Sequence, residues 1–296
     1  MNTAALHLIL QNGFIEGAVV SSGRVLRASR AESGVPRLDE LWGTDLAALD
    51  QPVAQIVRTL GVAPGTPTVV VYTSPKTIVE VFSVPARGAE ALKAGSLALA
   101  EMLGVTADYS ASTVMSIWES RSRTEPRSMV LAAGEPDTTP ETICSLLERA
   151  GLLPRRLVPM RAASILSSWE SSKRSGAQSA ILVDIGSDHT TMLGVVAGEL
   201  RLVRQVAIGY DLCVDAYERA IRATRTESEP PPARSEAARA FWTHGVPGRA
   251  TSVDGRRTMG ADVLPILQPI MQRTSIEIKQ TLRFGLETDD RVAVRL

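Results

Sequence analysis

The chain has 296 residues, about twice the length of a typical single domain, which predicts two domains or one large bilobed one. Apolar residues make up 44% and charged residues 22%, proportions that are typical of a globular protein and exclude disorder over most of the chain. The 32 basic and 32 acidic side chains cancel, so the sequence lacks the excess of Lys and Arg with which proteins coat nucleic acid.

Cysteine content and hydropathy indicate the compartment. Cys144 and Cys213 are too few for a disulfide scaffold and lack the spacing of metal ligands. Both lie in apolar segments, where a free cysteine packs as a small hydrophobic residue. The N-terminus has no signal-peptide pattern, and no run approaches the roughly 18 apolar residues that a membrane span needs. We therefore expect a cytoplasmic protein without membrane insertion.

We expect residues 1–75 to form the first part of a first domain. The segment from Leu6 to Arg30 predicts strands that are broken at Gly13, at Gly17 and at the turn 21–23. A helix is expected over 46–60, where Gly61 ends it, and a buried strand over 68–72.

We expect residues 76–155 to form a small α/β subdomain that is inserted into that first domain. Its expected elements are strands over 78–84 and 128–133, a helix over 89–103, and a second helix that begins at Pro140 and ends before Gly151. Residues 156–179 are predicted to return to the first domain as a helix over 161–169, followed by a polar linker over 167–179.

We expect residues 180–296 to form a second domain, because strand-like sequence patterns begin again at residue 180. Strands are expected over 180–184, 191–196 and 200–206, with a hairpin turn at Gly198, and a helix over 210–223. A small Pro- and Arg-rich subdomain over 222–262 is expected to be loose or partly mobile along 226–258. A long amphipathic helix follows over 263–284, where Pro269 predicts a kink or a late start. The last residues, 291–296, predict a core strand, and we expect a C-terminally truncated chain because natural chains seldom stop there.

The stretch 181–191 carries the most chemical information. A buried strand ends at Asp184, the chain turns at Gly186 with small hydroxyl residues, and an antiparallel strand returns. Such a turn can direct backbone N–H groups and hydroxyls at a phosphate, and an Asp can hold a hydrated Mg²⁺. On the bare motif, a plain hairpin in which Asp184 and Gly186 serve only the turn is the commoner explanation.

The wider context of this stretch resembles a known family. Residues 181–213 are similar to the phosphate-binding hairpin of the actin-like ATPase superfamily, and specifically of the PilM family of type IV pilus assembly proteins, which is related to FtsA. The strand 69–72, the segment 141–154, the helix 161–169 and the long helix 263–284 occur in the same order as in that family. The resemblance implies an α/β fold of the actin-like, ribonuclease H-like type, with two lobes.

The resemblance also implies a nucleotide site. Four residues of the hairpin match the family's second phosphate motif, and Gly209 matches the second Gly of the following Gly-Gly segment. The matching hairpin residues are Asp184, Gly186, Ser187 and Thr190. Asp184 is the residue that would hold the metal. Gly13 matches the Gly of the first phosphate motif near the N-terminus.

Several positions depart from the family pattern. Gln11 stands where the first motif has Asp, and a neutral amide cannot replace the charge of a carboxylate on a hydrated metal. Ile208 and Cys213 replace a Gly and a Thr, and the family's adenosine-contacting loop would follow Leu296. We therefore expect ATP and Mg²⁺ binding to be weak or lost, and ATP hydrolysis is doubtful.

Other candidate groups suggest no chemistry. His189 has no partner at metal-ligand spacing and is expected to be a solvated turn residue. The sequence contains no Ser-His-Asp order, nucleophile elbow or carboxylate pair, so no catalytic residue is assigned.

The function implied by the resemblance is that of a scaffold in a type IV pilus or related machine. Its partner would be the short cytoplasmic tail of an inner-membrane PilN-like protein, with a pilus motor ATPase as a further candidate. The protein would then lie at the inner membrane through protein contacts. Two alternatives stay open: an active actin-like ATPase, and a relative of the GspL cytoplasmic domain of type II secretion systems.

Overall fold

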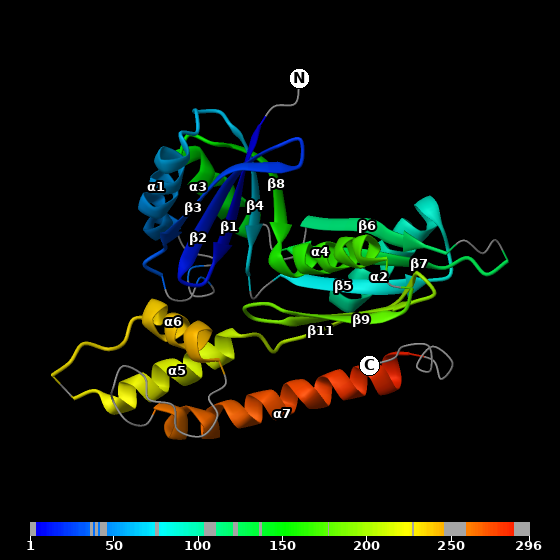
Figure 1. Cartoon of the computed structure of the whole chain (residues 1–296). Helices are drawn as coiled ribbons and strands as arrows, with labels where there is room; N and C mark the ends of the chain where they lie inside the picture. The colour runs from blue at the N-terminus through cyan, green and yellow to red at the C-terminus, as the bar shows by residue number, and fades with distance from the viewer. Residues whose placement is uncertain are drawn as a thin grey trace. The chain divides into compact units, whose positions relative to one another are not determined.

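The computed structural model of the chain describes residues 4–35, 38, 41, 46–74, 77–103, 111–120, 124–135, 138–176, 178–226, 228–245 and 259–286. It divides into two compact units, residues 1–167 and 168–296 (Figure 1). None of the helices in the described ranges combines the length and the apolar character that a membrane span requires. The strand expected over 291–296 lies outside the described residues.

A five-stranded sheet forms the centre of the first unit, with the order β3-β2-β1-β4-β8. The strands are β1 (Ala5–Gln11), β2 (Phe14–Ser21), β3 (Arg24–Glu32), β4 (Pro67–Tyr72) and β8 (Leu153–Pro159). Strands β1, β2 and β3 form an antiparallel meander, whereas β1, β4 and β8 run parallel. The carboxyl ends of β1, β4 and β8 therefore share one edge of the sheet.

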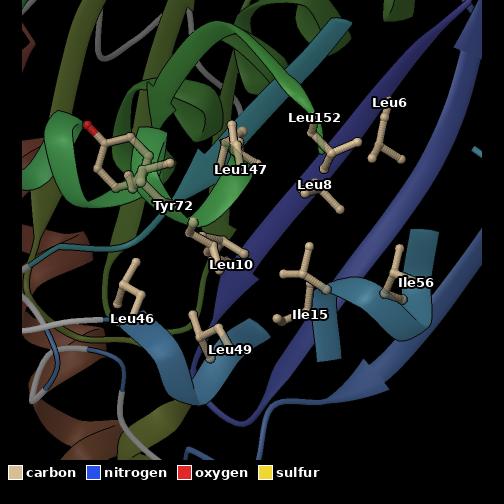
Figure 2. Packing of buried hydrophobic residues seen from close by; sticks show 14 of the residues in the cluster. Leu6, Leu8, Leu10, Ile15, Leu46, Leu49, Ile56, Tyr72, Leu147 and Leu152 are labelled. Carbon is tan, nitrogen blue, oxygen red and sulfur yellow. The ribbon is translucent and has the colours of Figure 1, made fainter. Parts of the chain in front are cut away.

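Two helices cover one face of this sheet. Helix α1 (Asp50–Leu60) follows a short 3-10 turn (Leu46–Leu49), and α3 (Thr138–Arg149) precedes β8. Alternate residues of β1 point into the core beneath them, as Figure 2 shows for Leu6, Leu8 and Leu10 beside Ile56 and Leu147. The apolar period of two on the strand and of about 3.6 on the helices accounts for this packing.

Gly17 does not break a strand, contrary to the prediction. It lies within β2, and a Cβ at this position would approach Cγ2 of Ile56 to 2.3 Å. The missing side chain therefore serves the close packing of α1 on the sheet, while Gly13 and the 21–23 segment provide the turns.

The inserted subdomain is smaller than predicted. Its antiparallel sheet has the order β5-β7-β6 and is covered on one face by α2 (Gly88–Leu103). The strands are β5 (Ile78–Val84), β6 (Ala111–Glu119) and β7 (Ser128–Glu135). Helix α3 and strand β8 belong instead to the layers of the first sheet, so the insertion ends near Glu135 and not at residue 155.

Helix α4 (Met160–Ser175) replaces most of the polar linker that was predicted over 167–179. Ser and Lys residues made this segment look like a loop. Ser167, Ser172 and Ser175 instead return their hydroxyls to backbone carbonyls three residues earlier, which lets them sit in a helix.

The second unit begins within α4 and continues with an antiparallel sheet in the order β11-β10-β9. The strands are β9 (Ala180–Ile185), β10 (Thr190–Val196) and β11 (Glu199–Val206), which confirms the predicted hairpin. Among the described residues this sheet has three strands.

Three helices complete the second unit: α5 (Asp211–Thr224), α6 (Arg234–His244) and α7 (Met259–Gly285). They share one apolar cluster that includes Tyr217, Ala237 and Leu267. Helix α7 continues through Pro269, so the late start is wrong. The 234–244 part of the segment predicted to be loose is a packed helix, and residues 246–258 lie outside the described residues.

Candidate functional site

The predicted phosphate-binding turn, residues 186–189, joins β9 to β10 in the second unit. Ile185 and Thr190 are paired across the hairpin, and the backbone N–H of Gly186 donates to the carbonyl of His189 at 2.8 Å. The turn is therefore tight and fixed by the two strands that enter and leave it.

The segment before α5 braces this turn from behind. The N–H of Tyr210 donates to the carbonyl of Gly186, and the N–H of Asp211 donates to that of Ser187, each at 2.9 Å. A Cβ on Gly209 would lie 2.1 Å from the carbonyl oxygen of Ser187, so only Gly permits this approach. Gly209 thus acts through packing against the turn.

Thr190 strengthens the same brace. Its hydroxyl is fully buried and donates to the carbonyl of Ile208 at 2.6 Å. A hydroxyl already used in this way serves the internal structure of the turn. In this chain Thr190 therefore stabilises the turn itself, and its assignment to a phosphate site stays a prediction.

His189 is buried, which contradicts the prediction of a solvated turn residue. Only 2% of its surface is exposed, and its Nδ1 lies 2.6 Å from Oδ1 of Asp188. The ring packs against Gly186, where a Cβ would lie 3.5 Å from its Cε1 atom and 3.2 Å from the carbonyl oxygen of His189. Nε2 is buried without a hydrogen-bond partner among the described residues. No local pattern could indicate this burial, because it depends on the way the turn folds back.

Asp184 lies next to the end of β9, opposite Thr191 of β10. Its side chain is half-buried, and the hydroxyl of Ser168 on α4 donates to its Oδ2 at 3.4 Å. No cluster of three His, Cys, Asp or Glu with metal-binding geometry occurs in the described part of the chain. A hydrated Mg²⁺ on one carboxylate would not need such a cluster, so the assignment of Asp184 stays a prediction.

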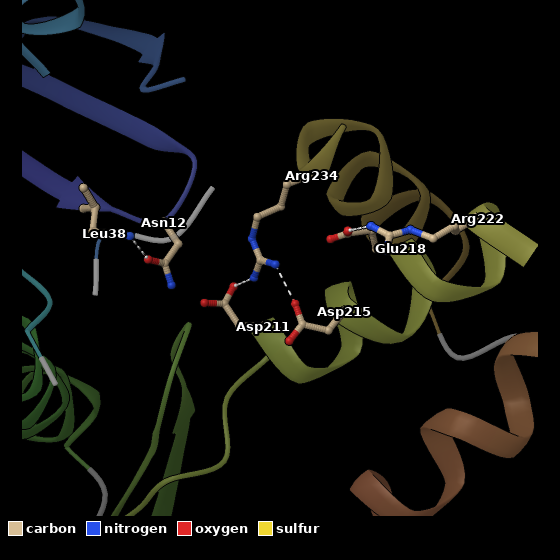
Figure 3. A network of polar contacts seen from close by, with 7 residues as sticks. All are labelled: Asn12, Leu38, Asp211, Asp215, Glu218, Arg222 and Arg234. Carbon is tan, nitrogen blue, oxygen red and sulfur yellow. Dashed lines mark hydrogen bonds and ion pairs between the residues drawn. The ribbon is translucent and has the colours of Figure 1, made fainter. Parts of the chain in front are cut away.

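The first phosphate turn, Gln11 to Gly13, lies in the first unit and is tied to the chain that follows β3. Gly13 has a φ of +81°, and its N–H donates to the carbonyl of Val35 at 3.0 Å. The Oδ1 of Asn12 accepts the N–H of Leu38 at 2.8 Å, as Figure 3 shows. An N–H that could have faced a phosphate is thus already bonded.

The sequence reasoning missed a buried polar cluster at the carboxyl edge of the first sheet. The hydroxyls of Tyr72 and Thr77 both donate to Oε1 of Glu135, the latter at 2.6 Å. Oε2 of Glu135 is buried without a partner among the described residues. Burial raises the pKa of Glu135, although the two hydroxyls oppose this shift. The one available signal was an acidic residue at the end of an otherwise apolar strand.

The sequence also missed a buried ion pair that fastens α6 to α5. Arg234, only 10% exposed in its side chain, lies 2.9 Å from Asp211 and 2.5 Å from Asp215 (Figure 3). Burial alone would lower the pKa of Arg234, but the two carboxylates raise it above its ordinary value. Asp211 also opens α5 beside the turn, so the helix N-terminus there already faces a negative charge.

Comparisons with known proteins identify the fold. No family model and no curated protein matches the sequence. Among solved structures, a chain of the "PilM-PilN type IV pilus biogenesis complex" is similar with a TM-score of 0.69 and 14% identity, over 96% of this chain and 78% of that chain. The chain therefore shares the fold of that chain, and this is the actin-like α/β fold that the sequence predicted.

Two weaker likenesses accompany this match. The ethanolamine utilization protein EutJ from Carboxydothermus hydrogenoformans has a TM-score of 0.45 and 12% identity, over 98% of this chain and 74% of that chain. The cytoplasmic domain of EpsL, an inner-membrane component of the type II secretion system of Vibrio cholerae, has a TM-score of 0.41 and 12% identity, over 78% of this chain and 84% of that chain. Neither adds a further assignment.

Proposed function

We propose that this protein is an actin-like scaffold of the PilM type, whose ligand is the short cytoplasmic tail of a PilN-like inner-membrane protein. The observation that carries the proposal is the likeness to a chain of a PilM–PilN complex over 96% of this chain. In this scheme the protein lies in the cytoplasm and reaches the membrane through its partner. A pilus motor ATPase is a further candidate partner.

The physical mode of binding that suits such a ligand is capture of an extended peptide. Main-chain hydrogen bonds supply affinity, and apolar side chains supply specificity. The inserted subdomain, residues 78–135, is the part most suited to provide the groove, because it is added to the core sheet of the first unit. Its two ends meet, since Ile78 and Gly134 are direct partners across β5 and β7.

We also propose that nucleotide binding is weak or lost. Gln11 supplies no charge, the N–H of Gly13 donates to Val35, and the hydroxyl of Thr190 is spent on Ile208. Asp184, Gly186 and Ser187 are the residues that would hold Mg²⁺ and phosphate, and a bound metal would supply charge neutralisation. The residues present do not fit a tight site, so no hydrolytic step is assigned to them.

The test of the partner is calorimetry with a synthetic peptide. The N-terminal tail of a PilN-like protein from the same organism should bind with micromolar affinity, and a scrambled peptide should not. The same titration is then made on a variant in which a two-residue Gly-Ser linker replaces residues 78–135. The linker is long enough because the two ends of this segment lie on adjacent strands, about 5 Å apart. The variant should keep a cooperative unfolding transition and lose the peptide. Unchanged affinity would place the groove elsewhere.

The test of the nucleotide is a titration of the full chain with Mg-ATP. The loss of a charged group and of free donors costs a few kcal/mol, which moves a micromolar affinity to about the millimolar range. Micromolar binding, or steady hydrolysis, would support the active-ATPase alternative instead.

A further inference from the structure

A groove of about 320 Å³ lies between α5 and α7 in the second unit. Two apolar rows form its walls at a helical spacing of four residues: Leu212 and Ala216 on α5, and Ile266 and Ile270 on α7. Leu212 is 39% exposed, which is unusual for a large apolar side chain in the first turns of a packed helix. The small side chain of Ala216 leaves the space between the two helices open.

Two guanidinium groups stand at the rim of this groove. Arg219 on α5 and Arg273 on α7 are exposed, and neither makes an ion pair or hydrogen bond within the described part of the chain. The lining holds one acidic residue, Asp215, which pairs with Arg234 at 2.5 Å, although Arg234 is shared with Asp211. The groove therefore offers an apolar floor, and its two guanidinium groups exceed the one carboxylate of the lining by a single positive charge.

We propose that this groove is a docking site for an acidic amphipathic helix of a protein partner. Two parallel apolar rows on neighbouring helices accept the apolar stripe of a third helix, the usual helix-in-groove mode. Carboxylates on the flank of that helix would pair with Arg219 and Arg273, which sets both its charge and its direction. The site is separate from the peptide groove of the proposed function, which lies in the first unit.

The experiment selects ligands from a displayed library of random 16-residue peptides against the full chain. The selected peptides should carry Asp or Glu between apolar residues at spacings of three and four. Reversing both rim charges with Arg219→Glu and Arg273→Glu should lower the affinity of the selected peptides by roughly tenfold or more, because two attractive charge pairs become repulsive. Leu212→Ser should lower this affinity as well. All three residues are exposed, so the variants are expected to fold.

The matched control makes the same change of charge away from the groove, with Arg239→Glu on α6 and Lys279→Glu on α7, both exposed. It should leave the affinity of the peptides within about twofold. Peptides that bind all variants equally, or that are basic, would overturn the proposal. So would a dimer in sedimentation analysis that only the rim variant dissociates, since the occupant would then be a second copy of this chain.

The PilN-like tail peptide is measured on the same variants to separate the two proposals. An unchanged affinity for the tail, together with loss of the acidic peptides, supports two independent surfaces. Loss of both ligands in the rim variant would make this groove the site of the tail and overturn the present inference. Failure of the tail to bind the unaltered chain would affect only the proposed function.

Discussion

The two turns that the sequence identified as phosphate motifs differ in length and in the residues that support them. In the first unit, two residues separate the paired Gln11 and Phe14; the N–H of Gly13 donates to the carbonyl of Val35, and the amide oxygen of Asn12 accepts the N–H of Leu38. In the second unit, the turn at 186–189 is braced from behind by residues 208–211. The comparison shows that a matching motif need not keep its donors available, because the chain that follows decides where they go.

The largest expected effect is that of Gly209→Ala. The new Cβ would lie 2.1 Å from the backbone oxygen of Ser187, which is held by the turn and cannot move alone. We expect a loss of about 3 kcal/mol or more in the free energy of unfolding, measured by urea denaturation. The matched change in the first turn is Gly13→Ala, where nothing lies within 4 Å and only the positive φ costs about 1 kcal/mol. Equal losses would refute the difference between the turns.

Breaking one hydrogen bond in each turn should lower the free energy of unfolding in the same order, more for the second turn than for the first. Thr190→Val keeps the shape of the side chain but leaves the buried carbonyl of Ile208 unpaired, at a cost of about 1–3 kcal/mol. Asn12→Ala removes the acceptor of the Leu38 N–H from a hydrogen bond that is only partly buried, and should cost about 1 kcal/mol. The half-buried Thr142→Val on α3 is the control and should stay within about 0.5 kcal/mol, because its hydroxyl only returns to the carbonyl of Thr138 in the same helix. A larger loss for Asn12→Ala than for Thr190→Val would reverse the ranking.

The pH dependence of stability should distinguish the first unit through Glu135. Because its pKa is raised on folding, the folded chain holds this proton longer than the unfolded chain does. The stabilisation is complete below the ordinary carboxyl pKa and is lost as pH rises through the raised pKa. Urea midpoints taken from about pH 4 to pH 8 should therefore show this decline, and Glu135→Gln should remove it. The exposed Glu80→Gln serves as control, and an unchanged profile in Glu135→Gln would contradict the assignment.

The smallest expected effect is a gain of function. Gln11→Asp restores the carboxylate of the first motif, but the N–H of Gly13 remains bonded to Val35. We expect the affinity for Mg-ATP to rise by less than about tenfold in calorimetry, or about 1.4 kcal/mol. A rise to micromolar affinity would mean that the missing charge alone had silenced the site and that the covered N–H is unimportant.

The inserted subdomain and the linker show where sequence patterns misled the prediction. Helix α3 follows β7 directly in the chain, so the sequence grouped both in one subdomain. Packing of Ile143 and Leu147 against β1 assigns α3 to the first sheet instead. The serines of α4 led to the prediction of a loop, but their hydroxyls donate hydrogen bonds to carbonyls of the helix backbone. Neither outcome is set by local composition, because both depend on which distant surface is buried.

The sequence by itself determined most strands, most helices and the hairpin at Asp184, because alternation, helical periodicity and turn residues act over a few neighbouring positions. It did not predict β6, β8 or α6. It also sufficed for the resemblance that the fold confirmed. Tertiary structure alone decided the burial of His189, the brace of Gly209 on Ser187, and the contact of Tyr72 with Glu135, 63 residues away. Each of these joins groups that are brought together only when separate elements pack, so no local pattern could have recorded them.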